Sequence, residues 1–328
     1  MKPSPRTALI FGISGQDGAY LARHLNDQGY TVHGTSRDSD ANPFASLRRL
    51  GVRDAVTVHS ATLGDFRSVL QVIQSTLPTF IFNLAGQSSV SLSFAQPVDT
   101  INSNMHGTIN ILEAVRFLGL DTRFYYAASS ECFGNTVEGP ADETTPFRPR
   151  SPYGVGKAAG FWAVANYREA YNIFACSGLL FNHDSPLRPE RYVTRKTVCG
   201  AADIAERKTD RLTLGALDIV RDWGWAPDYV DAMTRMLRLD RPEDFVVATG
   251  VSVKLEHLVD EVFRAFGLDW TRHVEVDKSM FRPSDIVVSA ANPAKAKRVL
   301  GWSASVRMPE LVAKLVEGEL SFRHGLKK

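Results

Sequence analysis

Residues 7–25, TALIFGISGQDGAYLARHL, join an apolar run typical of a strand to a segment of helical spacing through three glycines. Gly12, Gly15 and Gly18 permit a tight turn and a close approach of the backbone to a phosphate. The free N–H groups and the dipole of a helix over residues 19–26 would favour negative charge there. The stretch predicts a dinucleotide-binding loop, although its G-x-x-G-x-x-G spacing also suits a plain glycine turn between a strand and a helix.

The first half of the chain repeats this alternation of strand and helix. Residues 107–118 carry an apolar stripe at helical spacing, and the strand-like runs are almost continuously apolar, as in strands buried on both faces. The pattern predicts an α/β fold with a Rossmann-type, doubly wound parallel sheet. Its predicted strands are residues 7–12, 30–36, 55–60, 80–86, 123–129 and 173–181.

The pattern loosens after residue 182 into loops rich in Pro and Arg. Short strands at 212–217 and 245–249 and helices at 255–266 and 309–319 follow. We therefore expect residues 1–182 to form the dinucleotide-binding domain. Residues 183–328 should form mainly a smaller α+β substrate lobe, with segments such as 245–249 free to return to the main sheet.

Composition excludes several classes of partner. The chain has 328 residues, 44% hydrophobic and 23% charged, and its net charge of +2 is too small to predict nucleic-acid binding. Cys132, Cys176 and Cys199 are widely spaced, which predicts neither a disulfide framework nor a metal site. With no apolar stretch of signal-peptide or membrane-spanning length, we expect a soluble, cytoplasmic protein.

The end of the second predicted strand bears on the choice of dinucleotide. A carboxylate at this place binds the ribose 2′-hydroxyl of NAD, whereas an arginine accommodates the 2′-phosphate of NADP. The sequence reads Ser36-Arg37-Asp38. Arg37 favours NADP, and Asp38 keeps NAD open.

Tyr153 and Lys157 are four residues apart at the start of a helical segment, so their side chains should share one face. An ammonium beside a tyrosine is expected to lower its pKa and make it a usable base. The fifth predicted strand ends at Ser129-Ser130-Glu131, at the sheet edge where ligands bind in such folds. Ser129 can donate a hydrogen bond to a reacting oxygen, and Glu131 adds a general acid or base.

Together with the glycine loop, several strings resemble the GDP-mannose 4,6-dehydratase family over nearly the whole chain. They are SPYGVGK (151–157), FNHDSP (181–186), VTRK (193–196), RDWG (221–224), FRPSD (281–285) and NPAKAKRVLGW (292–302). The resemblance implies a nucleotide-sugar lyase with bound NADP that converts GDP-mannose to GDP-4-keto-6-deoxymannose. It also implies a homodimer, with a tetramer as the alternative.

The resemblance assigns four catalytic residues. Tyr153 would take the proton of the sugar 4-hydroxyl while hydride passes from C4 to the cofactor, and Ser129 would hold the reacting oxygen. Glu131 would remove the C5 proton, water would leave from C6, and the hydride would return to C6. Lys157 would lower the pKa of Tyr153 and hold the nicotinamide ribose.

The same resemblance implies two sets of binding residues. Beside the three glycines, Arg37, Tyr153 and Lys157, the cofactor would contact Gln16, Asp17, Thr62, Leu63, Leu84 and Ala85. The substrate would contact Ser88, Asn182, Arg188, Val193, Lys196, Arg221, Arg282 and Asp285. Four of these, Asn182, Arg188, Arg221 and Arg282, would hold the nucleotide diphosphate, which suits the planar fork of arginine.

Departures from the family pattern keep alternatives open. Ser129 stands where these dehydratases usually carry threonine. Nucleotide-sugar epimerases and 4-keto reductases carry serine at this position. Thr62 replaces an aspartate that contacts adenine, so looser recognition of the cofactor's adenine stays open. Pro189-Glu190 replaces a glycine-led stretch, so another base or sugar in the substrate stays open. A reductase or epimerase, or more remotely a non-catalytic dinucleotide sensor, is the competing interpretation.

Overall fold

The computed structural model describes residues 6–325. A seven-stranded sheet, in which every neighbouring pair is parallel, forms the larger lobe. This confirms the predicted Rossmann-type α/β fold. In spatial order its strands are β10 (Phe245–Val247), β6 (Ala175–Leu180), β5 (Arg123–Ser129), β4 (Phe80–Asn83), β1 (Thr7–Phe11), β2 (Thr31–Ser36) and β3 (Val56–Ser60).

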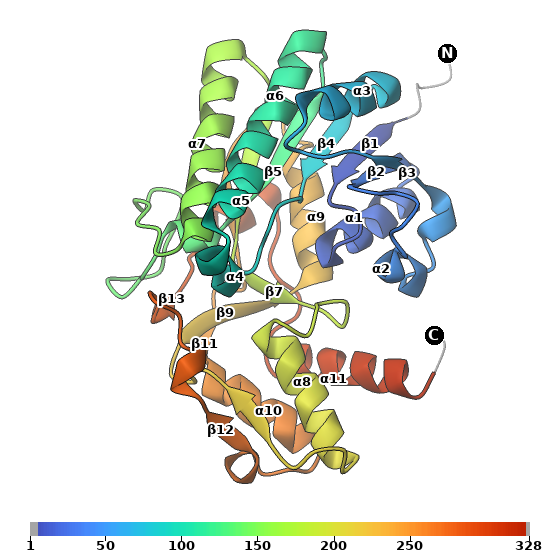
Figure 1. The fold of residues 1–328 in the computed structure, drawn as a ribbon. Helices are drawn as coiled ribbons and strands as arrows, with labels where there is room; N and C mark the ends of the chain where they lie inside the picture. The colour runs from blue at the N-terminus through green and yellow to red at the C-terminus, as the bar shows by residue number, and fades with distance from the viewer. Residues whose placement is uncertain (1–5, 326–328) are drawn as a thin grey trace.

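Helices cover both faces of this sheet (Figure 1). On one face α1 (Gln16–Asp27) and α9 (Ala226–Met236) share an apolar core with α2 (Ala45–Arg49). On the other face lie α3 (Phe66–Thr76), α6 (Gly107–Leu118) and α7 (Pro152–Tyr171). The short helices α4 (Val90–Ala95) and α5 (Pro97–Ile101) lead into α6 through a π-helical turn, Asn102–His106.

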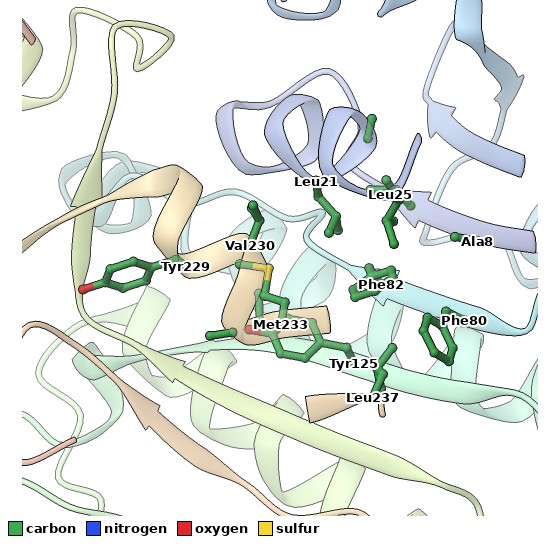
Figure 2. Close-up of a cluster of buried hydrophobic side chains, with 14 of the residues drawn as sticks. Ala8, Leu21, Leu25, Phe80, Phe82, Tyr125, Tyr229, Val230, Met233 and Leu237 are labelled. Atoms are coloured by element: carbon green, nitrogen blue, oxygen red, sulfur yellow. The ribbon is translucent and has the colours of Figure 1, made fainter. Parts of the chain in front are cut away.

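Helix α9 follows a strand of the smaller lobe and yet packs against the main sheet. Figure 2 shows its Met233 among side chains of α1, β4 and β5. The aromatic rings beneath it are in contact, with centroids 6.2 Å apart for Phe80 and Phe82 and 5.9 Å for Phe82 and Tyr125. Burial of this apolar surface ties the second half of the chain to the first lobe.

The smaller lobe has a separate core. Strand β9 (Val220–Trp225) pairs with β7 (Asn182–Asp184), β11 (Ser252–Lys254) and β13 (Val288–Ser289), and β8 (Leu212–Leu214) pairs with β12 (Val274–Val276). Helices α8 (Val193–Ala205), α10 (Leu255–Ala265) and α11 (Glu310–Arg323) pack around them. Figure 1 shows this α+β layer below the main sheet.

Ion pairs join two helices of the smaller lobe, α8 and α11. Glu319 of α11 forms ion pairs with Arg323, at 2.6 Å, and with Arg195 of α8, at 2.5 Å. Such a network fixes α11 against α8, because each buried charge has a partner. Among residues 6–325, none of the helices has the length and apolar character needed to cross a bilayer.

Candidate active site

The glycine loop has the geometry that close approach to a phosphate requires. Gly12 has φ +90°, and a Cβ there would lie 2.9–3.0 Å from backbone atoms of Leu84 and Ala85. A Cβ at Gly18 would lie 2.3 Å from the Gly12 carbonyl oxygen, so both glycines are required sterically. Gly15 precedes α1 in an extended conformation, with no side-chain cap on the helix. The N–H groups of the first turn therefore remain available to an anion such as a pyrophosphate.

Gln16 and Asp17, expected to contact a cofactor, direct their side chains to the smaller lobe. Gln16 Nε2 donates to the His183 carbonyl oxygen at 3.2 Å, and the Ser185 hydroxyl donates to Gln16 Oε1 at 2.8 Å. Asp17 Oδ2 lies 2.9 Å from His183 Nε2. Both residues belong to the first turn of α1, so their contact with a cofactor stays a prediction, now expected of their backbone groups.

The Asp17–His183 pair is charged. Burial acts to raise the pKa of Asp17, but the charge of His183 and its hydrogen bond lower this pKa to about 2. For His183, burial acts to lower the pKa, and the Asp17 carboxylate outweighs it and raises the pKa above the usual value. His183 Nδ1 also lies 2.7 Å from the Phe181 carbonyl oxygen, and its ring stacks on Tyr229 with centroids 4.3 Å apart. The imidazolium is thus held on both nitrogens and one face.

Ser129, Tyr153 and Lys157 meet where β5 ends and α7 begins. Ser151 caps α7 by accepting from the Gly154 N–H at 3.0 Å, which places Tyr153 in the first helical turn. The Ser129 hydroxyl forms a hydrogen bond with the Tyr153 phenol. Lys157 Nζ donates to the Ala127 carbonyl oxygen at 2.7 Å and lies 5.8 Å from the centroid of the Tyr153 ring. The structure therefore brings together the hydroxyl, phenol and ammonium predicted from sequence.

The pKa values differ from the simple expectation. Burial raises the pKa of Tyr153 well above its usual value, and the Ser129 hydrogen bond only partly opposes this. Burial also lowers the pKa of Lys157 to about 8. Lys157 directs its ammonium to the Ala127 carbonyl oxygen in this structure, so the lowering of the Tyr153 pKa by Lys157 stays a prediction.

Glu131 lies beside this group in a 3₁₀ turn, Ser130–Cys132. Burial raises the pKa of its carboxyl, although Arg282, Arg221 and a hydrogen bond from Ser151 act in the opposite direction. A carboxyl whose pKa is raised by burial, with cations nearby, is a candidate for proton transfer in a site.

The arginines predicted to bind substrate form a cluster with Asp285. Arg221 is 4% exposed in β9, and its Nη2 lies 3.4 Å from Asp285 Oδ1. Arg282 Nη1 lies 3.1 Å from the same oxygen. A single carboxylate thus serves two guanidinium groups, which leaves donors free for a further anion.

The remaining predicted substrate residues lie where the lobes meet. Arg188 Nε lies 3.3 Å from Asp184 Oδ1, and its guanidinium lies 3.9 Å from the centroid of the Tyr192 ring. Ser88, in the loop after β4, shares a 2.7 Å hydrogen bond with the Tyr192 hydroxyl. Asn182 begins β7, Val193 begins α8, and Lys196 lies in the first turn of α8.

Sequence reasoning missed Tyr192 and the contacts of His183 and Ser185 with the glycine loop. His183 and Ser185 belong to the motif FNHDSP, but the motif alone does not show which residues they contact.

Arg37 and Asp38 follow β2, and Thr62 and Leu63 follow β3. Asp38 Oδ1 accepts the backbone N–H groups of Asp40 and Ala41, each at 2.9 Å, so its carboxylate is engaged within its own loop. Arg37 is exposed after β2. The Thr62 N–H donates to Ser68 Oγ at 3.1 Å, and the Leu63 carbonyl accepts from Asn110 at 2.7 Å.

The chain is similar to known proteins over almost its full length. The sequence profile of a family described as GDP-mannose 4,6 dehydratase matches residues 9–315. A GDP-mannose 4,6-dehydratase of Sinorhizobium fredii is 40% identical, covering 98% of this chain and 99% of the relative. GDP-mannose 4,6 dehydratase 1 of Arabidopsis thaliana is 41% identical, covering 96% and 90%.

Solved structures share the fold at lower identity. A dTDP-glucose 4,6-dehydratase from Streptomyces venezuelae, solved with NAD, is 20% identical with a TM-score of 0.85, covering 97% of this chain and 98% of that one. A UDP-glucose 4-epimerase from Thermotoga maritima, solved with UDP-glucose, is 21% identical with a TM-score of 0.85, covering 98% and 99%.

Asp17→Asn should destabilise the protein by about 3 kcal/mol at pH 6, because it leaves His183 without its partner. The contribution of the raised His183 pKa is complete below the unfolded value of 6.5 and is lost as pH rises through the folded value. The contribution of Asp17 is lost only as pH falls through about 2. Between pH 6 and 9 the urea midpoint of the parent should therefore fall more steeply than that of Asp17→Asn.

The matched control is Asp27→Asn, at the end of the same helix, whose carboxylate lies 4.0 Å from Arg23 at an exposed site. It should leave both midpoint and slope close to the parent. Parallel pH slopes for the parent and Asp17→Asn would contradict the assignment of charge to this pair.

Proposed function

The chain belongs to the GDP-mannose 4,6-dehydratase family, and we propose that it removes water from GDP-mannose to give GDP-4-keto-6-deoxymannose, with NADP as its cofactor. The observation that carries the proposal is the half-buried Glu131 beside the Ser129–Tyr153 hydrogen bond. Oxidation of an alcohol needs only the serine, tyrosine and lysine. Loss of water from the neighbouring carbons needs an additional base.

Each residue then has a distinct task. Tyr153 takes the proton of the 4-hydroxyl, and Ser129 holds that oxygen in place. A bound nicotinamide dinucleotide supplies the acceptor for hydride from C4 and its return to C6. Because the 4-ketone acidifies the neighbouring C5–H, Glu131 can remove this proton and pass it to the C6 hydroxyl, which leaves as water. The proton that Tyr153 took from the 4-hydroxyl balances the one that C5 regains when hydride returns to C6.

We assign the nucleotide sugar to the interface between the lobes. Arg221 and Arg282 share Asp285 and lie near Glu131, so a diphosphate there would meet two guanidinium groups. Arg188 provides a third, on the side of Tyr192. In this proposal residues 1–182 hold mainly the dinucleotide, and residues 183–328 hold mainly the sugar nucleotide while contributing β10 and α9 to the first lobe.

NADP rather than NAD is supported by the loop after β2. The Asp38 carboxylate already accepts two N–H groups of its own loop. It is therefore a poor partner for a ribose 2′-hydroxyl, whereas the exposed Arg37 can approach a 2′-phosphate. The open glycine loop fits the pyrophosphate of either dinucleotide.

We propose a homodimer, with a tetramer as the alternative, in the cytoplasm. Helices α6 and α7 lie side by side (Figure 1). Phe117 of α6 and Trp162 of α7 are 69% and 62% exposed, and such rings favour an interface. The three cysteines are buried and unpaired, which suits a reducing compartment.

The proposed dimer predicts that sedimentation of the parent protein gives twice the mass of one chain. The Trp162→Asp variant should sediment with the mass of one chain.

The proposed activity has a direct test. GDP-mannose incubated with the pure protein and a trace of NADP⁺ should give a nucleotide sugar lighter by one water, because the cofactor is regenerated at each turnover. Mass spectrometry follows the sugar nucleotide, and absorbance follows reduced cofactor. Stoichiometric consumption of NADPH would instead identify a 4-keto reductase, and an isomer of unchanged mass would identify an epimerase.

Two isosteric variants serve as controls for this experiment. Glu131→Gln should lower water loss at least 100-fold while the C4 hydrogen still exchanges with cofactor label, because only the C5 base is lost. Tyr153→Phe should abolish exchange and water loss alike while cofactor binding persists. Dehydration by Glu131→Gln at the parent rate would exclude Glu131 as the base.

Arg37→Ala should weaken NADP⁺ binding about 10- to 100-fold and leave NAD⁺ binding nearly unchanged, since a charge-assisted hydrogen bond to phosphate is lost. Isothermal titration with each dinucleotide measures this without turnover. Arg23→Ala, an exposed arginine of α1, is the matched control. Equal affinity of the parent for both dinucleotides would overturn the NADP preference.

A further inference from the structure

Phe322 lies in the last turn of α11, in the smaller lobe, and its ring reaches the first lobe. It packs against the apolar core that α2 shares with α1 and α9. The guanidinium of Arg49, the last residue of α2, lies 4.2 Å from the centroid of the Phe322 ring. Figure 1 shows this end of α11 below α2. The ring therefore connects the two lobes at α2, in addition to the Asp17–His183 pair.

Contacts on two sides of α11 fix the position of Phe322. Gly318 packs so closely on Pro186 that a Cβ at this position would overlap the proline ring. Since Gly318 and Phe322 are four residues apart, they share one face of the helix. Glu319 pairs with Arg195 of α8 at 2.5 Å, and both side chains are less than 10% exposed. The Phe322 ring is thus presented to α2 by a helix that is held along its length.

The start of α2 closes the loop of residues 37–44, which follows β2. Phe44 directly precedes α2, is 2% exposed and has φ +47°, a conformation that a bulky side chain adopts only where packing holds it. The Phe44 N–H donates to Asn42 Oδ1 at 2.9 Å. Asn42 Nδ2 in turn donates to Ser36 Oγ, at the end of β2, at 3.1 Å. The loop is therefore tied to β2 at one end and to α2 at the other.

Helix α2 cannot hold its own position. It has five residues, and isolated helices of this length are not stable in water. Leu47 anchors one side of α2 in the core, and Phe322 contacts Arg49 at its end. The place of α2, and with it the far end of the loop, thus depends on a side chain of the smaller lobe.

We propose that Phe322 is a positioning residue for the cofactor. Through α2 it holds the loop of residues 37–44 in the shape that accepts the 2′-phosphate of NADP, so that the smaller lobe contributes to the choice of dinucleotide. The inference rests on the proposed function, which places that phosphate at Arg37. NAD has no phosphate at this position, so its binding depends less on the shape of the loop.

The test compares the two dinucleotides in Phe322→Ala. The variant should raise the Kd of NADP⁺ about 3- to 10-fold and that of NAD⁺ less than about twofold, because only the 2′-phosphate bonds to the loop. With saturating NADP⁺, its kcat on GDP-mannose should stay within about twofold of the parent, since Phe322 touches no reacting group. Isothermal titration gives the affinities. Phe322→Leu keeps apolar contact with the core and loses the aromatic face toward Arg49, so its NADP⁺ affinity should lie between those of Phe322→Ala and the parent.

Phe266→Ala is the matched control, because Phe266 is a half-buried phenylalanine that packs on the core of the smaller lobe at the end of α10. It should lower Tm and leave the ratio of the two dinucleotide affinities unchanged. An unchanged ratio in both Phe322 variants, or an equal change of ratio in Phe266→Ala, would overturn the inference alone. Equal affinity of the parent for both dinucleotides would overturn the proposed NADP preference, and the inference with it.

Discussion

The Asp17–His183 ion pair is the contact on which the arrangement of the site depends. Asp17 lies in the first turn of α1, directly after the glycine loop, and His183 lies in β7 of the smaller lobe. The stacking of His183 on Tyr229 extends the contact to α9, which packs back onto the main sheet. One pair of opposite charges therefore positions the loop, the smaller lobe and the returning helix together.

Burial decides the chemistry of the groups gathered around that contact. Desolvation disfavours the charged form of each catalytic group, raising the pKa of Tyr153 and Glu131 and lowering that of Lys157. Desolvation thus makes each of these groups harder to charge, and it moves Tyr153 further from ionisation at neutral pH than a free phenol. Arg221 and Arg282 oppose this effect at Glu131.

The sequence predicted what depends on local pattern. The six apolar runs of the first half lie in the main sheet, and residues 107–118 form α6. The helix α9 was not predicted, because its apolar face matches a partner that is distant in sequence, as Figure 2 shows. For the same reason, motif spacing predicted that Tyr153 and Lys157 lie close together, but it could not predict the contact between Ser88 and Tyr192. The pKa of Tyr153 could not be predicted either, because it depends on burial and on neighbouring groups that motif spacing does not reveal.

The return of β10 and α9 to the first lobe constrains how the protein can distinguish sugars. The chain passes between the lobes several times, while α9 and β10 are buried in the first lobe and the smaller lobe has its own core. These repeated crossings and the Asp17–His183 pair oppose a wide hinge motion, because the lobes are joined at several points instead of by one linker. Selectivity should therefore come from side chains of short segments at the interface, such as residues 182–196, instead of from domain closure. Pro189 and Glu190, which depart from the family pattern, lie in this segment, so we expect a change of preferred sugar to arise there while the fold and the catalytic group at β5 and α7 stay the same.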